Sequence, residues 1–119
     1  MYKALYLSPM IPSTEINGTI NFFTDLFQFK ILRSDDGYAI LYKDNLTVHI
    51  SKVDKLTGGM EFYLEVSKLD ELWESIKTNI AGLHVREPFD RDYGMREFHI
   101  GVPYTQALMF VGEDISKRN

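Results

Sequence analysis

The chain has 119 residues, of which 45% are hydrophobic and 25% are charged, and its formal net charge is −4. These values predict one folded domain spanning residues 1–119 and exclude a disordered chain. The 13 basic residues are outnumbered by 17 acidic ones and form no clustered basic patch. We therefore expect no nucleic-acid partner and no attachment to an anionic membrane.

The sequence contains no cysteine, which excludes disulfides, thiolate metal ligands and a cysteine nucleophile. A chain without cysteine fits a reducing compartment. The N-terminal MYKALYLSPM lacks the long apolar run and the small-residue cleavage pattern of a signal peptide. No stretch stays apolar for the roughly 18 residues that a membrane span needs. These features predict a cytoplasmic protein.

The first half of the chain predicts a strand, a helix and three more strands. The first strand covers 3–10 and is ended by Pro9 and Pro12, because proline cannot donate a hydrogen bond to a sheet. Ser13 or Thr14 then caps the helix. The apolar face of this helix comprises Ile16, Ile20, Phe23 and Phe27. The strands that follow are predicted at 29–33, 38–43 and 46–52.

The second half repeats this order of elements. A strand at 60–66 follows the glycine pair at 58–59. Ser67 and Asp70 resemble a capping box, which begins a second helix. The apolar stripe of this helix comprises Leu69, Leu72, Trp73, Ile76 and Ile80. Three more strands are predicted at 83–88, 95–102 and 106–113.

The repeated order predicts an α+β fold made of two βαβββ modules, about 1–54 and about 58–113. We expect each module to form a curved mixed sheet with its helix on the convex side, and the two sheets to surround a cleft. No sequence pattern determines the conformation of the loops at 88–94 and 102–106.

Several segments together resemble a known family. They are INFFTDLFQFKILR, DDGYAILYKDNLTVHIS, EFYLEVSKLDELWESI, GMREFHI and LMFVGE. In this order they are similar to the glyoxalase/bleomycin-resistance/dioxygenase family of the vicinal-oxygen-chelate superfamily, and most of all to its bleomycin-resistance-like members. The resemblance implies a homodimer whose clefts bind a small molecule. It does not decide the chemistry, because one fold hosts many functions.

The resemblance also implies four positions that hold a metal ion in the metal-dependent members. In this chain these positions fall near Ser8, His49, Glu61 and Met109. His49 and Glu61 are suitable ligands, whereas a serine hydroxyl and a soft thioether are not. A catalytic zinc site normally has three protein ligands. Metal binding would therefore require a further ligand, Glu97 or His99.

Strand alternation places most of the candidate residues on one face of each predicted sheet. His49 alternates with the apolar residues of 46–52, and Glu61 and Tyr63 alternate with those of 60–66. The predicted ligand-binding residues are Tyr38, His49, Glu61, Tyr63, Glu97, His99 and Met109. Two alternatives remain for these residues: the tyrosines pack against one another, and Glu61 is a solvated carboxylate.

Two functions remain open at the level of sequence. The first is a binding protein that sequesters a drug or metabolite without a metal or other cofactor. The alternative is a lyase, isomerase or dioxygenase that uses a divalent metal held by His49 and Glu61 as a Lewis acid. Beside these two stands a binding module for a partner or for a metabolite unrelated to antibiotics. The chain has no G-x-G-x-x-G, P-loop or G-x-S-x-G motif, which argues against nucleotide cofactors and acyl transfer.

Overall fold

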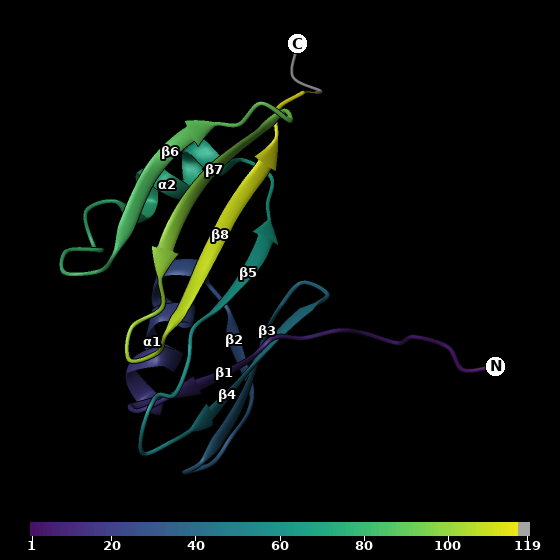
Figure 1. The fold of residues 1–119 in the computed structure, drawn as a ribbon, viewed down its shortest axis with the longest axis vertical. Coiled ribbons are helices and arrows are strands. Elements are labelled where there is room, and N and C mark those ends of the chain that lie inside the picture. Colours follow the sequence, from purple (N-terminus) through teal and green to yellow (C-terminus); the bar gives the residue numbers. More distant parts are fainter. Residues whose placement is uncertain (117–119) are drawn as a thin grey trace. The chain divides into compact units, whose positions relative to one another are not determined.

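The computed structural model describes residues 1–116, which form two compact units; the first ends at Leu56 and the second begins at Thr57. The first unit contains β1 (Met10–Ser13), α1 (Ile16–Phe27), β2 (Lys30–Ser34), β3 (Tyr38–Lys43) and β4 (Leu46–Lys52) (Figure 1). Its four strands form a sheet in the order β1-β4-β3-β2. The β1–β4 pair is parallel and the other two pairs are antiparallel.

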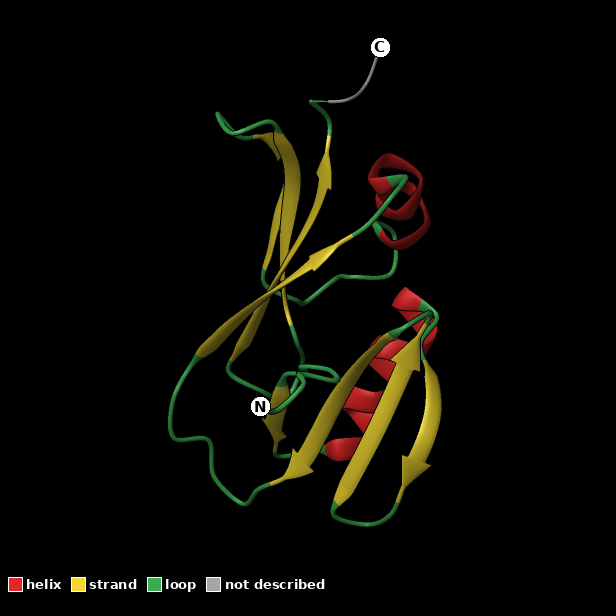
Figure 2. Cartoon of the chain, turned by 90° about the vertical axis from the view of Figure 1, so that its right-hand side faces the viewer, coloured by secondary structure: helices red, strands yellow, loops and turns green. Residues whose placement is uncertain are grey.

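The second unit repeats this arrangement. It contains β5 (Met60–Glu65), α2 (Leu69–Ile76), β6 (Val85–Asp90), β7 (Met95–Gly101) and β8 (Ala107–Asp114). The sheet order is β5-β8-β7-β6, with β5 and β8 parallel. Each unit therefore combines one helix with a mixed sheet of four strands (Figure 2). The predicted α+β fold with two βαβββ modules is confirmed.

The core of the first unit lies between α1 and its sheet. The helix contacts β3 and β4. Phe23 and Phe27 of α1 are 1% and 3% exposed, and Leu41 and Ile50 on the facing strands are fully buried. A stripe of large side chains on a helix that packs against alternating strand residues is the standard way to bury both elements.

In the second unit, the apolar residues of β7 and β8 that alternate toward α2 form the core. Phe98 is fully buried, and its ring centroid lies 5.2 Å from that of Trp73 on α2. Ile100, Met109 and Val111 are almost completely buried on the same side. Leu69 and Ile76 complete this core from α2.

The position of the first strand differs from the prediction of 3–10. β1 spans Met10–Ser13 and contains Pro12. The carbonyls of Pro9 and Ser13 accept hydrogen bonds from His49 and Val53 of the neighbouring chain segment, so alternate residues from Pro9 onward face β4. Pro12 therefore points its nitrogen away from the sheet, which an edge strand tolerates. A proline in this place interrupts no ladder and does not end the strand.

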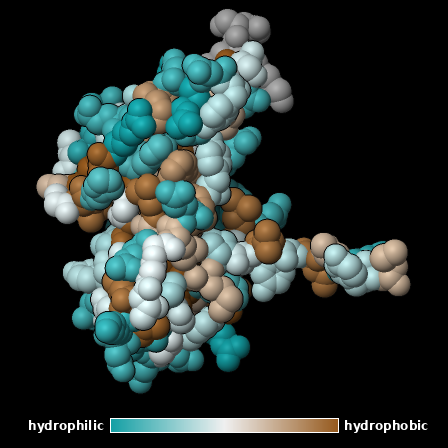
Figure 3. All heavy atoms as spheres, in the orientation of Figure 1, coloured by the Kyte–Doolittle hydropathy of each residue, from teal (hydrophilic) through white to brown (hydrophobic). Residues whose placement is uncertain are grey.

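Residues 1–7 precede β1 without secondary structure of their own. They carry large apolar side chains that are at least 70% exposed, namely Met1, Tyr2, Leu5, Tyr6 and Leu7. Figure 3 shows brown and tan apolar atoms along this segment. The alternation of apolar residues in this segment therefore does not produce a strand in the chain.

Both predicted helix caps are wrong. Glu15 occupies the N-cap position of α1 without a side-chain cap. Ser13 belongs to β1, and its hydroxyl accepts from the Glu15 N–H at 3.1 Å and lies 2.7 Å from that of Thr19. At α2 the predicted capping box is replaced by a contact from another element. The Leu69 N–H donates to the carboxylate of Glu113 on β8, at 3.0 Å. A carboxylate at this end of a helix compensates the N–H groups that have no partner within it.

Within residues 1–116, neither α1 nor α2 is long and apolar enough to cross a membrane.

Candidate functional site

In the first unit, the face of the sheet opposite α1 carries a tyrosine–histidine pair. Ile40 and His49 are cross-strand partners, so His49 lies on the face that alternates with buried Val48 and Ile50. The Tyr38 hydroxyl lies 2.7 Å from His49 Nδ1, and the two rings meet edge to face. Tyr38 and His49 are both half-buried. The structure thus brings these two predicted site residues together.

Ser8, the first of the four metal positions implied by the resemblance, precedes β1. Its hydroxyl donates to the Thr47 carbonyl at 2.8 Å. This bond ties the chain before β1 to the first residues of β4. The serine side chain therefore serves the backbone of the unit, which is the ordinary use of a half-buried hydroxyl.

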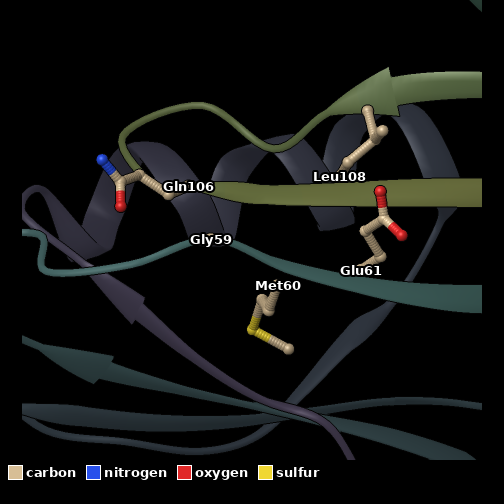
Figure 4. A pocket seen from close by; sticks show the side chains of 5 residues that line it. All are labelled: Gly59, Met60, Glu61, Gln106 and Leu108. Carbon is tan, nitrogen blue, oxygen red and sulfur yellow. The ribbon is translucent and has the colours of Figure 1, made fainter.

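In the second unit, Glu61 lines an open pocket at the start of β5. The pocket is formed by Gly59, Met60, Glu61, Gln106 and Leu108. Glu61 and Leu108 are register partners on β5 and β8, and their side chains lie on the same side in Figure 4, while Met60 points away. Glu61 is exposed. Its carboxylate is accessible to a ligand in this pocket.

Glu97 is fully buried on the same face of this sheet and is surrounded by hydrogen-bond donors. Its Oε2 accepts from the hydroxyls of Tyr63 and Tyr93, at 2.8 and 2.5 Å. Its Oε1 lies 3.3 Å from His99 Nε2 and 3.5 Å from an Arg91 guanidinium nitrogen. Because an ionised carboxylate only accepts, His99 must carry its proton on Nε2 in this contact. Both carboxylate oxygens are therefore occupied by the protein itself.

Gly112 on β8 makes the contact between Tyr63 and Glu97 geometrically feasible. The Tyr63 ring reaches from β5 across β8 to Glu97 on β7. A Cβ atom at position 112 would lie 2.7 Å from Tyr63 Cζ and 3.2 Å from Glu97 Cγ. Any residue larger than glycine would push the tyrosine off the carboxylate, because real Cβ atoms do not approach so closely.

The hydrogen bonds shift the ionisation of the groups in this cluster. Burial alone raises the pKa of the Glu97 carboxyl, but donation from Tyr93, Tyr63 and His99 and the charge of Arg91 outweigh burial, so this pKa lies below its usual value. The pKa of Tyr63 is raised, first by burial and then by its bond to the carboxylate. Glu97 is thus held as an anion and Tyr63 as a neutral donor.

His99 lies within a stack of aromatic rings beside this cluster. Its ring stacks on Phe110 with a centroid distance of 3.8 Å and meets Phe89 edge to face at 5.3 Å. The imidazole is only 8% exposed. The structure therefore joins Glu97 and His99, as their spacing of two residues predicts, in a cluster whose outer members are Tyr63 and Tyr93.

Met109 lies on the opposite face, which corrects its assignment to the ligand-binding residues. It pairs with Phe62 on one side and Ile100 on the other and is 1% exposed, within the core against α2. Its neighbour Phe110 takes the face of Tyr63 and His99 instead. In a strand, a register difference of one residue exchanges the two faces.

The four metal positions do not fit a metal ion. The Ser8 hydroxyl is used by a carbonyl, and Met109 faces the core, so only His49 and Glu61 present suitable donors. Glu97, the predicted additional ligand, has both oxygens engaged by four donors. Within residues 1–116, no three His, Cys, Asp or Glu side chains are grouped so that they would hold a metal.

Sequence reasoning missed three members of the Glu97 cluster: Arg91, Tyr93 and Gly112. No sequence pattern determines the conformation of the loop at 88–94, in which Arg91 and Tyr93 both contact Glu97. A glycine in the middle of a strand was the available signal, because it often marks a place where another group approaches the backbone closely.

Two units with this topology make a fold that solved structures of bleomycin-binding and glyoxalase-type proteins share. The predicted resemblance is confirmed at the level of the fold. No protein-family model matches the sequence. No curated protein matches it either.

Among solved structures, the chain is similar to the bleomycin-binding protein of bleomycin-producing Streptomyces verticillus in complex with copper(II)-bleomycin. Its TM-score is 0.76, with 19% identity over 93% of this chain and 97% of that one. The bleomycin resistance determinant encoded on transposon Tn5 gives 0.79, with 18% identity over 93% and 98%. Lactoylglutathione lyase from Agrobacterium tumefaciens gives 0.77, with 11% identity over 98% of both chains.

Proposed function

We propose that this protein is a cytoplasmic small-molecule-binding protein that sequesters a drug or metabolite without a metal, as a homodimer. The observation that carries this proposal is the state of the metal positions. The Ser8 hydroxyl donates to a backbone carbonyl of the first unit, and Met109 is buried in the core of the second. Only His49 and Glu61 of the four positions therefore remain as metal ligands. A catalytic zinc site normally needs three protein ligands.

The residues that remain suit binding better than bond breaking. Tyr38 and His49 in the first unit and Tyr63 in the second offer partly exposed rings, and Glu61 adds an exposed carboxylate. Rings of this kind stack on flat molecules, while the polar groups orient them. Glu97, with both oxygens engaged, keeps Tyr63 in place and does not act as a base.

Similarity to bleomycin-binding structures supports a first choice of ligand. Calorimetric titration with a bleomycin-type compound is expected to release heat at micromolar concentrations, and Glu61→Gln and His49→Ala are expected to weaken binding. Control variant Glu71→Gln changes an exposed carboxylate on α2 and is expected to bind as the parent does. No heat from the parent protein would remove the antibiotic version of the proposal.

The metal-dependent lyase or dioxygenase remains the second candidate because the fold is shared with lactoylglutathione lyase. Elemental analysis of protein purified without chelator separates the two. We expect metal well below one ion per chain, with no change in His49→Ala. A stoichiometric divalent metal that disappears in His49→Ala would contradict sequestration and support the enzyme.

A further inference from the structure

β6 contains a β-bulge that turns two side chains to the same face of the second unit's sheet. Arg86 pairs with His99 and Phe89 pairs with Glu97, so three steps along β6 match two steps along β7. In a regular strand, residues three apart point to opposite faces. The extra residue in the bulge brings Arg86 and Phe89 together on the face of Glu97 and His99. Bulges re-aim side chains in this way beside functional sites.

The bulge places the Arg86 guanidinium over the Phe89 ring, with Cζ 3.6 Å from the ring centroid. Arg86 is exposed, and no carboxylate of residues 1–116 forms an ion pair with it. A guanidinium that stacks through its flat face keeps the N–H groups of its edge free for a carboxylate. Arg91 differs from Arg86, because its guanidinium already forms an ion pair with Glu97, with 3.5 Å between the guanidinium nitrogen and Oε1.

Arg86 also begins a row of residues that crosses the sheet in register. The row consists of Arg86 on β6, His99 on β7, Phe110 on β8 and Tyr63 on β5. The His99 and Phe110 rings are stacked, Phe110 is half-buried, and Tyr63 is 45% exposed. Phe110 and Tyr63 therefore form a partly open aromatic surface in the same row as Arg86, whose guanidinium has no carboxylate partner within residues 1–116. Such a surface accepts the face of a flat ring.

On this face, Glu97 of the neighbouring strand β7 is buried and already engaged by four donors, and the exposed carboxylates of β5 lie at the other edge. Glu61 and Glu65 are on β5, and the strand order β5-β8-β7-β6 separates them from Arg86 by three strand spacings. At about 4.8 Å per spacing the two edges are roughly 14 Å apart. The Debye length at physiological salt is only about 8 Å. Glu61 and Glu65 therefore do little to offset the charge of Arg86.

We propose that the β6 end of this sheet recognises the carboxylate of a planar aromatic ligand through Arg86, with the ligand's ring lying over Phe110 and Tyr63. This inference rests on the proposed binding function and specifies the chemistry of its ligand. Phe89 restricts the guanidinium before the ligand arrives, which reduces the entropy lost on binding.

The test uses 2-naphthoate and its neutral isostere 2-naphthamide, titrated calorimetrically into the full chain up to about 1 mM. The parent protein is expected to bind naphthoate about tenfold or more tightly than naphthamide, because a bidentate charged pair is worth at least that much. Arg86→Gln is expected to remove this difference and leave naphthamide binding unchanged. Arg86→Lys retains the charge without the fork and is expected to give an intermediate affinity. Arg33→Gln, an exposed arginine of β2, is the matched control.

Three results would overturn the inference: equal affinity for the two probes, naphthoate binding that Arg86→Gln leaves unchanged, or no binding of either probe. If a bleomycin-type compound binds while naphthoate does not, this inference fails and the proposed binding function stands. If naphthoate binds through Arg86 while the bleomycin-type compound does not bind, the inference holds and the antibiotic version alone fails. Circular dichroism of Arg86→Gln, whose side chain is exposed, verifies that the fold is retained.

Discussion

At the scale of single residues, Glu97 is the most constrained side chain of the candidate site. A buried carboxylate is stable only when donors replace the water it has lost. Tyr63, Tyr93, His99 and Arg91 provide those donors. They come from β5, from the turn after β6 and from β7 itself. Glu97 therefore connects three parts of the second unit through one functional group.

Replacing this carboxylate by an amide is expected to destabilise the protein. Glu97→Gln removes the charge while leaving the donors in place, which should lower the free energy of unfolding at pH 7 by about 2–3 kcal/mol. Urea denaturation measures this change. Glu61→Gln, the same change at an exposed position of β5, should stay within about 0.5 kcal/mol. Equal stability of the two variants would contradict the role assigned to Glu97.

The same residue makes stability depend on pH. Because the pKa of Glu97 is lowered in the folded protein, the unfolded chain takes up its proton first as the pH falls. The stabilisation is fully present above the unfolded pKa of about 4.3 and is lost as the pH falls through the lower folded pKa. The difference in unfolding free energy between the parent protein and Glu97→Gln should therefore become smaller below about pH 4. A constant gap over that range, in denaturation curves, would argue against an ionised Glu97.

Gly112 offers an independent measurement of the Tyr63–Glu97 contact. Gly112→Ala places a Cβ where the Tyr63 ring lies, and such overpacking should cost about 1–3 kcal/mol of unfolding free energy. In a Tyr63→Ala background the same change should cost less than half as much. Gly58→Ala, where a Cβ meets nothing within 4 Å, is the matched control. Additive effects of the two changes would show that the tyrosine does not occupy this space.

At the scale of elements, the periodicity of the sequence predicted the helices and the inner strands well, but it predicted where these elements begin and end poorly. The strands at 38–43 and 46–52 match β3 and β4 residue for residue, because alternation with buried partners is written in their own sequence. The N-terminus of α2 depends on Glu113, which is 44 residues away from Leu69 in the chain. No local pattern encodes such a partner. Arg96 shares the apolar side of β7 for a similar reason, because Asp70 of α2 and Asp90 of β6 bind it.

The first strand provides the clearest test at this scale. Ile11 is fully buried in β1, so Ile11→Ala should lower the free energy of unfolding by about 2–4 kcal/mol. Deleting residues 2–7, whose apolar side chains are exposed, should change it by less than about 0.5 kcal/mol at the same protein concentration. Thermal or urea unfolding distinguishes the two. If the deletion lowered the free energy of unfolding as much as Ile11→Ala does, the result would support a first strand at 3–10.

At the scale of the whole molecule, each unit carries its own group of candidate residues. Tyr38 and His49 belong to the first unit, and Glu61, Tyr63 and the Glu97 cluster belong to the second. The internal repeat made the two modules predictable from sequence, because each carries its own periodicity. The arrangement of side chains on the second sheet was not predictable, because a bulge in β6 re-aims Arg86 and Phe89, and Gly112 in β8 admits the Tyr63 ring.

The proposed homodimer is the last prediction. Several large apolar side chains of the first unit are exposed on the single chain, among them Ile31 and Leu32 of β2 and Leu46 of β4, at 53%, 61% and 49%. Ile31 and Leu32 are consecutive on β2, and large apolar side chains left exposed are typical of surfaces covered by another chain. Light scattering coupled to size exclusion should therefore give twice the 13.8 kDa mass of the chain at protein concentrations of about 10 μM and above, where an interface of ordinary size holds two chains together. Dilution should lower the mass toward that of one chain. A single-chain mass that persists at ten times this concentration would contradict the dimer. The Glu97 and Arg86 predictions would remain, because all the groups they invoke belong to one unit of one chain.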